Sequence, residues 1–245
     1  MMRTFFTALG FLTLFPFPAR ENFEENDLGR SMAFFPLVGL LLGGILLSID
    51  YALSPFIPSR LLNIIIIAAM VLLTGGLHLD GFMDTLDGIG GGNNKEKILE
   101  IMRDSRVGAF GAMGIVFLVL IKWETLNSLE GDLKWKALIL MPVISRWGMA
   151  LLTHIAPYAR SQGLGRPFVN GLSRKNVVFA MLLALIISFT ASGVFGLLIM
   201  IIITGLCLLW SMWFIKKIGG VTGDVIGAFN ETAELAVLLI FALSA

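Results

Sequence analysis

Long apolar runs separated by short polar segments make up most of the chain. A helix needs about twenty apolar residues to cross roughly 30 Å of hydrocarbon. Membrane spans are predicted at 32–53, 60–77, 108–122, 136–155, 176–192, 195–214 and 225–244. The run from Val177 to Phe214 is too long for one span, and Ser192-Gly193 is the predicted turn within it. The pattern therefore predicts an all-α fold, a polytopic integral membrane helical bundle of about seven transmembrane helices, with six to eight compatible.

The composition is that of a membrane protein. Hydrophobic residues make up 57% of the chain, charged residues 14%, and the mean hydropathy is +0.88, whereas soluble domains are about half apolar and about a quarter charged. No long repeat or separate soluble segment is evident, so residues 1–245 are expected to form a single membrane-embedded domain. With a net charge of +1, nothing predicts a nucleic-acid partner, and the lone Cys207 excludes a disulfide within the chain.

The basic residues predict the orientation, because short loops rich in Lys and Arg stay on the cytoplasmic side. With the N-terminus inside, thirteen of the eighteen Lys and Arg residues fall on the cytoplasmic side, while Lys122 and Lys134 are among those outside. The segment 75–111, the loop 156–176 and the turn 219–224 then open on the same face. The protein is therefore predicted to be a multi-pass protein of the cell inner membrane with a cytoplasm-facing site.

The segment 75–111 carries three closely spaced acids. Asp80, Asp84 and Asp87 are four and three residues apart, so a helix places their carboxylates on one face. Such like charges repel each other. Divalent cations held between them would explain their grouping, and hard oxygen ligands favour Mg²⁺ or Mn²⁺ over zinc. The alternative is a solvated helix end just outside the bilayer.

The same segment holds further candidates. Asp104 follows Glu100 by four residues, and Arg103 and Arg106 suit an anionic, phosphorylated ligand. His78, two residues before Asp80, is placed to orient a carboxylate or touch a phosphate. A purely structural role for His78 is an equally good interpretation.

The last predicted span contributes a second acidic group. Asp224 is flanked by glycines, and Asn230, Glu231 and Glu234 follow within the span. Asp224, Glu231 and Glu234 fall roughly on one helix face. These groups would complete a metal or substrate site, whereas a plain helix cap is the competing interpretation of Asp224.

Three further arginines are candidates for binding substrate. Arg146 lies within a predicted span, where an unpaired guanidinium is costly, so a carboxylate or phosphate partner is predicted. Arg160 and Arg166 lie in a loop that also contains Gly163 and Gly165. Together they are typical of a loop that grips phosphate, although either arginine alone is explained as a cytoplasmic anchor.

Carboxylates, a divalent metal and arginines at one membrane face favour phosphoryl or nucleotidyl transfer. The sequence has no GxxxxGK[ST] segment, which argues against an ATPase motor. Two rival functions are a membrane prenyl- or phospholipid-type transferase with a lipid substrate, and a secondary transporter. The transporter is disfavoured because the two halves of the chain show no inverted symmetry.

Several segments resemble the cobalamin synthase, or adenosylcobinamide-GDP ribazoletransferase, family. They read GGLHLDGFMDTLDGIGGG, ILEIMRDSRVGAFG, SRW, PYAR followed by GLG, and GDVIGAFNE. The similarity runs from the N-terminal FLTLFPFP to the end of the chain. The resemblance implies a membrane-embedded, Mg²⁺-dependent phosphotransferase of the nucleotide-loop assembly in cobalamin biosynthesis. It would join adenosylcobinamide-GDP to α-ribazole or its 5′-phosphate, forming adenosylcobalamin or its 5′-phosphate and releasing GMP.

The resemblance also implies roles for the candidate residues. The metal ligands would be Asp80, Asp84 and Asp87, with Asp104 or Asp224 completing the shell. The substrate-binding residues would be Arg103, Arg106, Arg146, Arg160, Arg166 and Asn230. The catalytic residues would be Asp84, Asp87 and His78, with Asp87 or His78 as the base for the ribazole hydroxyl. The sequence leaves the formation of a homo-oligomer open.

Overall fold

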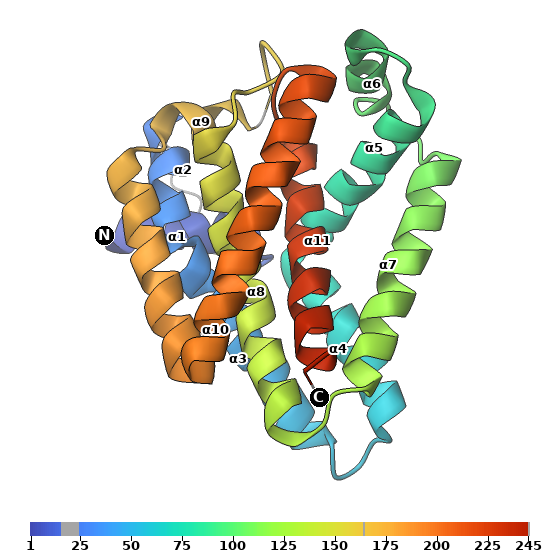
Figure 1. The fold of residues 1–245 in the computed structure, drawn as a ribbon, viewed down its shortest axis with the longest axis vertical. Coiled ribbons are helices and arrows are strands. Elements are labelled where there is room, and N and C mark those ends of the chain that lie inside the picture. The colour runs from blue at the N-terminus through green and yellow to red at the C-terminus, as the bar shows by residue number, and fades with distance from the viewer. Residues whose placement is uncertain (16–24, 164, 245) are drawn as a thin grey trace.

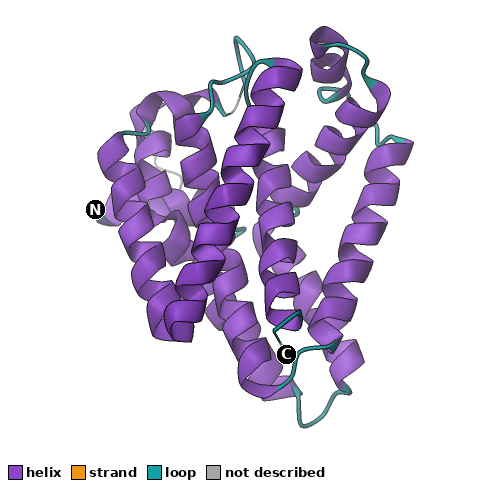
Figure 2. Cartoon of the chain, in the orientation of Figure 1, coloured by secondary structure: helices purple, strands orange, loops and turns teal. Residues whose placement is uncertain are grey.

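The computed structural model describes residues 1–15, 25–163 and 165–244. Within these ranges the chain is a bundle of helices, most of them aligned along one direction (Figures 1 and 2). Its elements are α1 (Met2–Leu12), α2 (Glu25–Ser31), η1 (Met32–Phe34), α3 (Phe35–Leu53), α4 (Ser59–Thr74), α5 (Leu77–Gly91), α6 (Lys95–Ile101), α7 (Ala109–Asn127), α8 (Gly131–Ile155), α9 (Arg166–Gly171), α10 (Arg174–Ile218) and α11 (Gly223–Ala242). The predicted all-α membrane bundle is confirmed.

Helix α8 lies at the centre of the bundle and packs against α3, α10 and α11. Small residues let neighbouring backbones approach it closely. A Cβ atom at Gly39 of α3 would lie 2.3 Å from the carbonyl oxygen of Pro142, and one at Gly43 would lie 2.8 Å from the Cα of Ile139. Such contact between backbones is a common way for helices to associate in lipid, and it encloses the charged side chain that α8 carries at Arg146.

The number of spans agrees with the sequence. In the described ranges five helices are long and apolar enough to cross a membrane, and there are six such spans if the bent pair of α4 and α5 is counted as one. The 45-residue α10 is broken at Ser192 and Gly193, and a Cβ at Gly196 would lie 2.2 Å from the carbonyl oxygen of Ser188. The two arms of α10 therefore run back alongside each other (Figure 1), which confirms the predicted turn and brings the count to seven.

The span predicted at 60–77 is interrupted near its end. Helix α4 ends at Thr74, and the helix direction turns by 92° before α5 begins at Leu77. Gly75 and Gly76 have φ angles of 62° and 69°, values that glycine adopts without the steric cost that other residues meet. The break directs α5, which carries the predicted acids, across α11 and along α7.

Two lysines that were predicted in loops on the non-cytoplasmic side are buried within the bundle. Helix α7 runs to Asn127, so Lys122 lies within a span, and Lys134 lies in the first turns of α8 against Asp50. Each ammonium pairs with a buried carboxylate, which a count of loop charges does not register.

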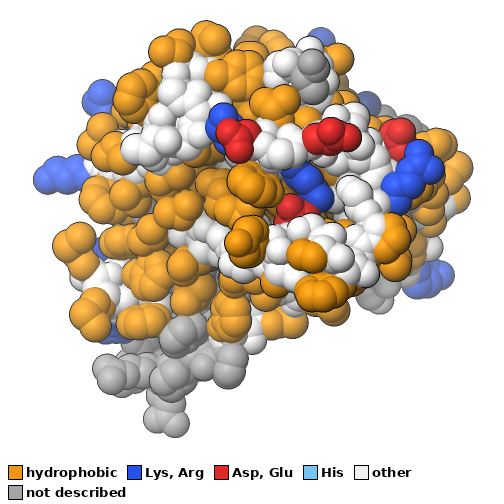
Figure 3. All heavy atoms as spheres, turned by 90° about the horizontal axis from the view of Figure 1, so that it is seen from below, with side chains coloured by type: hydrophobic (Ala, Val, Ile, Leu, Met, Phe, Trp, Pro, Cys, Tyr) orange, Lys and Arg blue, Asp and Glu red, His pale blue; other side chains and the backbone are white. Residues whose placement is uncertain are grey.

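At the end of the molecule opposite α6 and α9, hydrophobic side chains cover most of the surface and the visible acids gather in one region (Figure 3).

Candidate active site

Helices α5 and α11 cross with almost no side chain between them. A Cβ atom at Gly81 of α5 would lie 2.9 Å from the Cα and the carbonyl oxygen of Asp224. Only a glycine permits this approach, because the atoms it faces are backbone atoms. Asp80 and Asp84, which flank Gly81 along the helix, are thereby brought to the start of α11 beside Asp224. We call this place, with its three carboxylates, the acid crossing.

The carboxylates of the acid crossing are poorly compensated. Asp84 is partly exposed and experiences repulsion from Asp80, Asp87 and Asp224, while Arg160 supplies the attraction that partly offsets it. Several negative charges against one guanidinium leave a surplus of negative charge. A bound cation would remove that surplus.

Arg160 bridges the loop after α8 to the start of α11. Its Nη2 lies 2.9 Å from Oδ2 of Asp224 and donates to the carbonyl oxygen of Met102 over 3.4 Å. Asp224 is not the cap of α11, because the side chain of Thr222 accepts the backbone N–H of Val225 at 3.2 Å. Thr222 takes the capping role that was the alternative interpretation of Asp224, and its hydroxyl also donates to Oδ2 of Asp224 at 3.2 Å.

A short backbone pairing holds this loop in place. Tyr158 and Val221 form an isolated parallel bridge, in which the N–H of Val221 donates to the carbonyl of Pro157 at 2.9 Å. Burial raises the pKa of the Tyr158 phenol. The bridge ties the segment before Arg160 to the segment before Asp224, and so it sets their contact.

Asp87 reaches across to α7. Its Oδ2 accepts the backbone N–H of Gly108 and its Oδ1 that of Gly111, both at 2.8 Å. A carboxylate at a helix N-terminus satisfies otherwise unpaired donors and favours the helix dipole. Asp87 therefore anchors α7 to α5, and its roles as metal ligand and base stay predictions.

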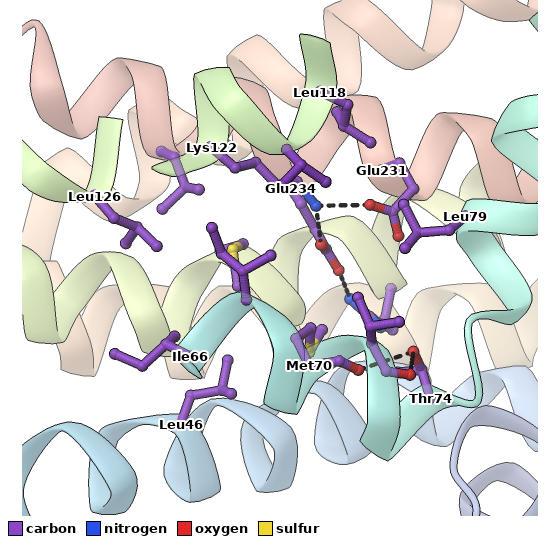
Figure 4. A pocket seen from close by; sticks show the side chains of 16 residues that line it. Leu46, Ile66, Met70, Thr74, Leu79, Leu118, Lys122, Leu126, Glu231 and Glu234 are labelled. Carbon is purple, nitrogen blue, oxygen red and sulfur yellow. Dashed lines mark hydrogen bonds and ion pairs between the residues drawn. The ribbon is translucent and has the colours of Figure 1, made fainter. Parts of the chain in front are cut away.

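A second polar group, which we call the interior charge cluster, lies inside the bundle. Its members are His78 of α5, Lys122 of α7, Arg146 of α8, and Asn230, Glu231 and Glu234 of α11. Lys122 Nζ contacts Oε2 of Glu231 at 2.6 Å and Oε2 of Glu234 at 2.7 Å (Figure 4). Arg146 Nη1 pairs with Oε1 of Glu234. The predicted carboxylate partner of Arg146 is thus confirmed.

The remaining contacts of the cluster join His78 and Asn230 to it. Asn230 Nδ2 donates to Oε1 of Glu234 at 3.1 Å, and Nδ1 of His78 lies 3.5 Å from Nη2 of Arg146. His78, Arg146 and Asn230 are each at most 2% exposed. The structure therefore places these three candidates in the interior of the bundle, each bonded to a protein group, and their catalytic and substrate-binding roles stay predictions.

The other candidates lie at the surface. Asp104 and Arg106 pair with each other, with 2.6 Å between Oδ2 and Nη2, and the hydrogen bonds from Arg106 lower the pKa of Asp104 to about 2. Arg103 is exposed, and Arg166 is exposed at the first residue of α9. The acid crossing is therefore formed by Asp80, Asp84 and Asp224, and the metal role of Asp104 stays a prediction.

The acid crossing has the donor chemistry that Mg²⁺ requires. Among the residues that the structure describes, no three His, Cys, Asp or Glu side chains are grouped closely enough to hold a metal ion by themselves. Mg²⁺ commonly takes only one or two protein carboxylates and completes its octahedron with water and substrate phosphates. Hard carboxylate oxygens with surplus negative charge fit a cation that is bound jointly with a phosphorylated substrate.

Sequence reasoning missed some members of these sites. Lys122 stands in the apolar run of α7, and a lysine in such a run is itself a signal of a buried partner. Thr222 precedes an apolar helix, which is a preferred place for a capping threonine. The carbonyl of Met102, which accepts from Arg160, had no signal in the sequence because the contact depends on how loops meet.

Comparisons with known proteins agree with one another. A family model described as cobalamin-5-phosphate synthase matches residues 4–242. The chain is 38% identical over 239 residues to an adenosylcobinamide-GDP ribazoletransferase of Geotalea daltonii, covering 98% of this chain and 96% of that protein. A protein of the same name from Syntrophobacter fumaroxidans is 41% identical over 241 residues, which cover 97% of this chain and 97% of that protein. Another from Klebsiella pneumoniae is 37% identical over 245 residues, which cover 98% of this chain and 99% of that protein. No solved structure matches the chain.

Proposed function

Because the chain belongs to the cobalamin-5-phosphate synthase family, we propose that it joins adenosylcobinamide-GDP to α-ribazole or α-ribazole 5′-phosphate. In this reaction a ribazole hydroxyl oxygen bonds to the phosphorus attached to the cobinamide. The bond from that phosphorus to the oxygen bridging to GMP breaks, GMP leaves, and the hydroxyl proton passes to a base. The products are GMP and adenosylcobalamin or its 5′-phosphate.

The meeting of Asp80, Asp84 and Asp224 at one helix crossing is the observation that carries this proposal. A diphosphate would be repelled by these carboxylates alone. Magnesium bound there would neutralise the diphosphate, stabilise the leaving phosphate and lower the pKa of the attacking hydroxyl. One or two of the carboxylates of Asp80, Asp84 and Asp224 would hold it, together with the substrate phosphates.

The protein groups around the acid crossing have complementary tasks. The backbone bridge between Tyr158 and Val221 holds Arg160 beside Asp224. The guanidinium of Arg160 can donate two parallel hydrogen bonds to phosphate oxygens. Access favours Asp84 as the proton acceptor, since Asp87 has both oxygens engaged by α7 and His78 is enclosed with Arg146. The exposed Arg103 and Arg166 would attract the anionic substrates as they approach.

We propose that the acid crossing opens to the cytoplasm from the cell inner membrane. The loops rich in Lys and Arg keep to one side by the positive-inside rule. The segment with α6 and the loop before α9 lie at the same end of the bundle (Figure 1). Both substrates carry ribose groups and adenosylcobinamide-GDP carries a diphosphate, so a water-filled approach from that end suits them.

An assay of the purified protein in detergent tests the proposal. With adenosylcobinamide-GDP and α-ribazole 5′-phosphate, we expect GMP and adenosylcobalamin 5′-phosphate in equal amounts when Mg²⁺ is present. After chelation of the metal, both products should be absent. A membrane lipid transferase is the rival, and turnover of an isoprenoid or diacylglycerol donor with none of the corrinoid would overturn the proposal.

A further inference from the structure

The interior charge cluster has features that stability alone does not explain. Its four charged members are two cations and two glutamates, with side chains at most 8% exposed. Charged groups at such depth are costly, and a buried ion pair is weak evidence of added stability because desolvation offsets the attraction. The cluster joins α5, α7, α8 and α11, including both helices that supply the acid crossing.

The cluster adjoins the acid crossing directly on α5 and lies further along the same helix on α11. His78 precedes Asp80 by two residues, and Asn230 follows Gly227 by three. A Cβ atom at Gly227 would lie 3.4 Å from the Cα and the carbonyl oxygen of His78. The contact of His78 with Arg146, and that of Arg146 with Glu234, therefore ties α5 within a turn of Asp80 to α11 at a point nearly three turns beyond Asp224.

Several polar atoms of the cluster have no hydrogen-bond partner within the described part of the chain, and a small cavity lies beside part of the cluster. His78 Nε2, Arg146 Nε and Asn230 Oδ1 are buried without a hydrogen-bond partner among the described residues. A cavity of about 30 Å³ lies beside the cluster, lined by Thr74, Leu79, Lys122, Arg146, Glu231 and Glu234 among others (Figure 4). The cavity adjoins Arg146 and Glu234, so packing alone does not fix these two side chains, and the Arg146 fork links Glu234 of α11 to His78 of α5.

We propose that Arg146 is a positioning residue for the acid crossing. By contacting His78 with one nitrogen and Glu234 with the other, it sets the rotation and depth of α5 against α11. Asp80, Asp84 and Asp224 are thereby kept at one helix crossing, where one or two of them can bind a cation together with substrate phosphates. This inference rests on the proposed function, since it concerns the same metal-binding acids.

Arg146→Lys tests the inference, because a lysine keeps the charge but lacks the planar fork that reaches both partners. Mn²⁺ serves as the probe, titrated into detergent-purified protein with GDP as the diphosphate and followed by electron paramagnetic resonance. We expect about tenfold weaker Mn²⁺ binding, as found for partners that orient metal ligands. We also expect a comparable fall in kcat, with the KM for adenosylcobinamide-GDP little changed.

A second buried ion pair provides the matched control. Lys134 Nζ lies 2.5 Å from Oδ1 of Asp50, and these residues belong to α8 and α3, neither of which carries an acid of the crossing. Asp50→Asn should lower the unfolding temperature and leave the affinity for Mn²⁺ unchanged. Equal loss of affinity in both variants, or unchanged affinity in Arg146→Lys, would overturn the inference.

A third variant tests the same contact if Arg146→Lys fails to insert into the membrane. His78→Asn shortens the side chain that contacts Arg146 and leaves every charge in the cluster paired. It should weaken Mn²⁺ binding as Arg146→Lys does, and unchanged binding contradicts the positioning role. The titration needs no turnover, so an inactive but Mn²⁺-binding parent protein would refute the proposed reaction and leave positioning to be judged by the variants. A parent protein that binds no Mn²⁺ would refute the positioning role as well.

Discussion

Helices α5 and α11 carry two polar regions with opposite charge balance. At the acid crossing, Asp80, Asp84 and Asp224 meet with Arg160 as the nearby cation. In the interior charge cluster, two glutamates are matched by a lysine and an arginine. The first region is partly open to solvent and the second is enclosed. A region whose charges are matched needs no ligand, whereas one with surplus negative charge is suited to bind a cation and its anionic partner.

Removing a charge from the acid crossing should affect turnover far more than folding. Asp84→Asn should lower kcat by more than about a thousandfold, because a metal ion contributes several kcal/mol to transition-state stabilisation. The folded protein should be no less stable, since the carboxylate that is lost was repelled by its neighbours. Turnover and thermal unfolding in detergent measure both effects, and full activity in this variant would remove the metal role of Asp84.

Removing a charge from the interior charge cluster should lower the stability of the fold strongly. Glu234→Gln leaves Arg146 without its carboxylate and Lys122 with Glu231 alone. Removing one partner of a buried ion pair lowers the free energy of unfolding by about 3 kcal/mol or more. Chemical unfolding in detergent measures this loss, and a variant as stable as the parent would show that the cluster is not held by its charges.

Pushing the two helices apart should affect both regions to a smaller degree. Gly81→Ala places a methyl group 2.9 Å from the backbone of Asp224, and such overpacking typically costs about 1–3 kcal/mol. We expect lower stability together with weaker activity. Gly227→Ala is the matched control, because its Cβ would meet His78 at 3.4 Å, an ordinary contact. Equal effects of the two substitutions would show that the crossing is not set at Gly81.

The smallest effect is expected at the surface pair of Asp104 and Arg106. The Arg106 guanidinium holds the pKa of Asp104 well below its usual range, but the pair is exposed. Exposed ion pairs contribute little to stability. Arg106→Gln should leave the unfolding temperature unchanged within error, and a clear drop would mean that the segment between α6 and α7 stabilises the bundle more than its exposure indicates.

Local patterns in the sequence predicted the features that depend on neighbours along the chain. Helical spacing placed Asp80 and Asp84 on one face, the length of the apolar run indicated a turn at Ser192-Gly193, and burial within a span required a partner for Arg146. Each of these follows from the geometry of a single helix or from the cost of a charge in lipid.

Features that depend on how helices meet were not predictable from the sequence. Lys122 finds its glutamates more than one hundred residues further along the chain. Asp87 caps α7 across a loop, so its spacing with Asp84 did not reveal its use. The glycine pair at 75–76 lies inside a long apolar run, and the run length therefore concealed the break between α4 and α5.

Binding of Mn²⁺ to purified protein in the presence of GDP tests most directly whether the acid crossing holds a cation on a diphosphate. The account predicts that the parent binds Mn²⁺ and that Asp84→Asn and Asp224→Asn each lose this binding. Glu100→Gln, which alters an exposed acid paired with Lys97 at 2.9 Å, should retain it. Equal Mn²⁺ binding in Asp84→Asn, Asp224→Asn and the parent would contradict the account.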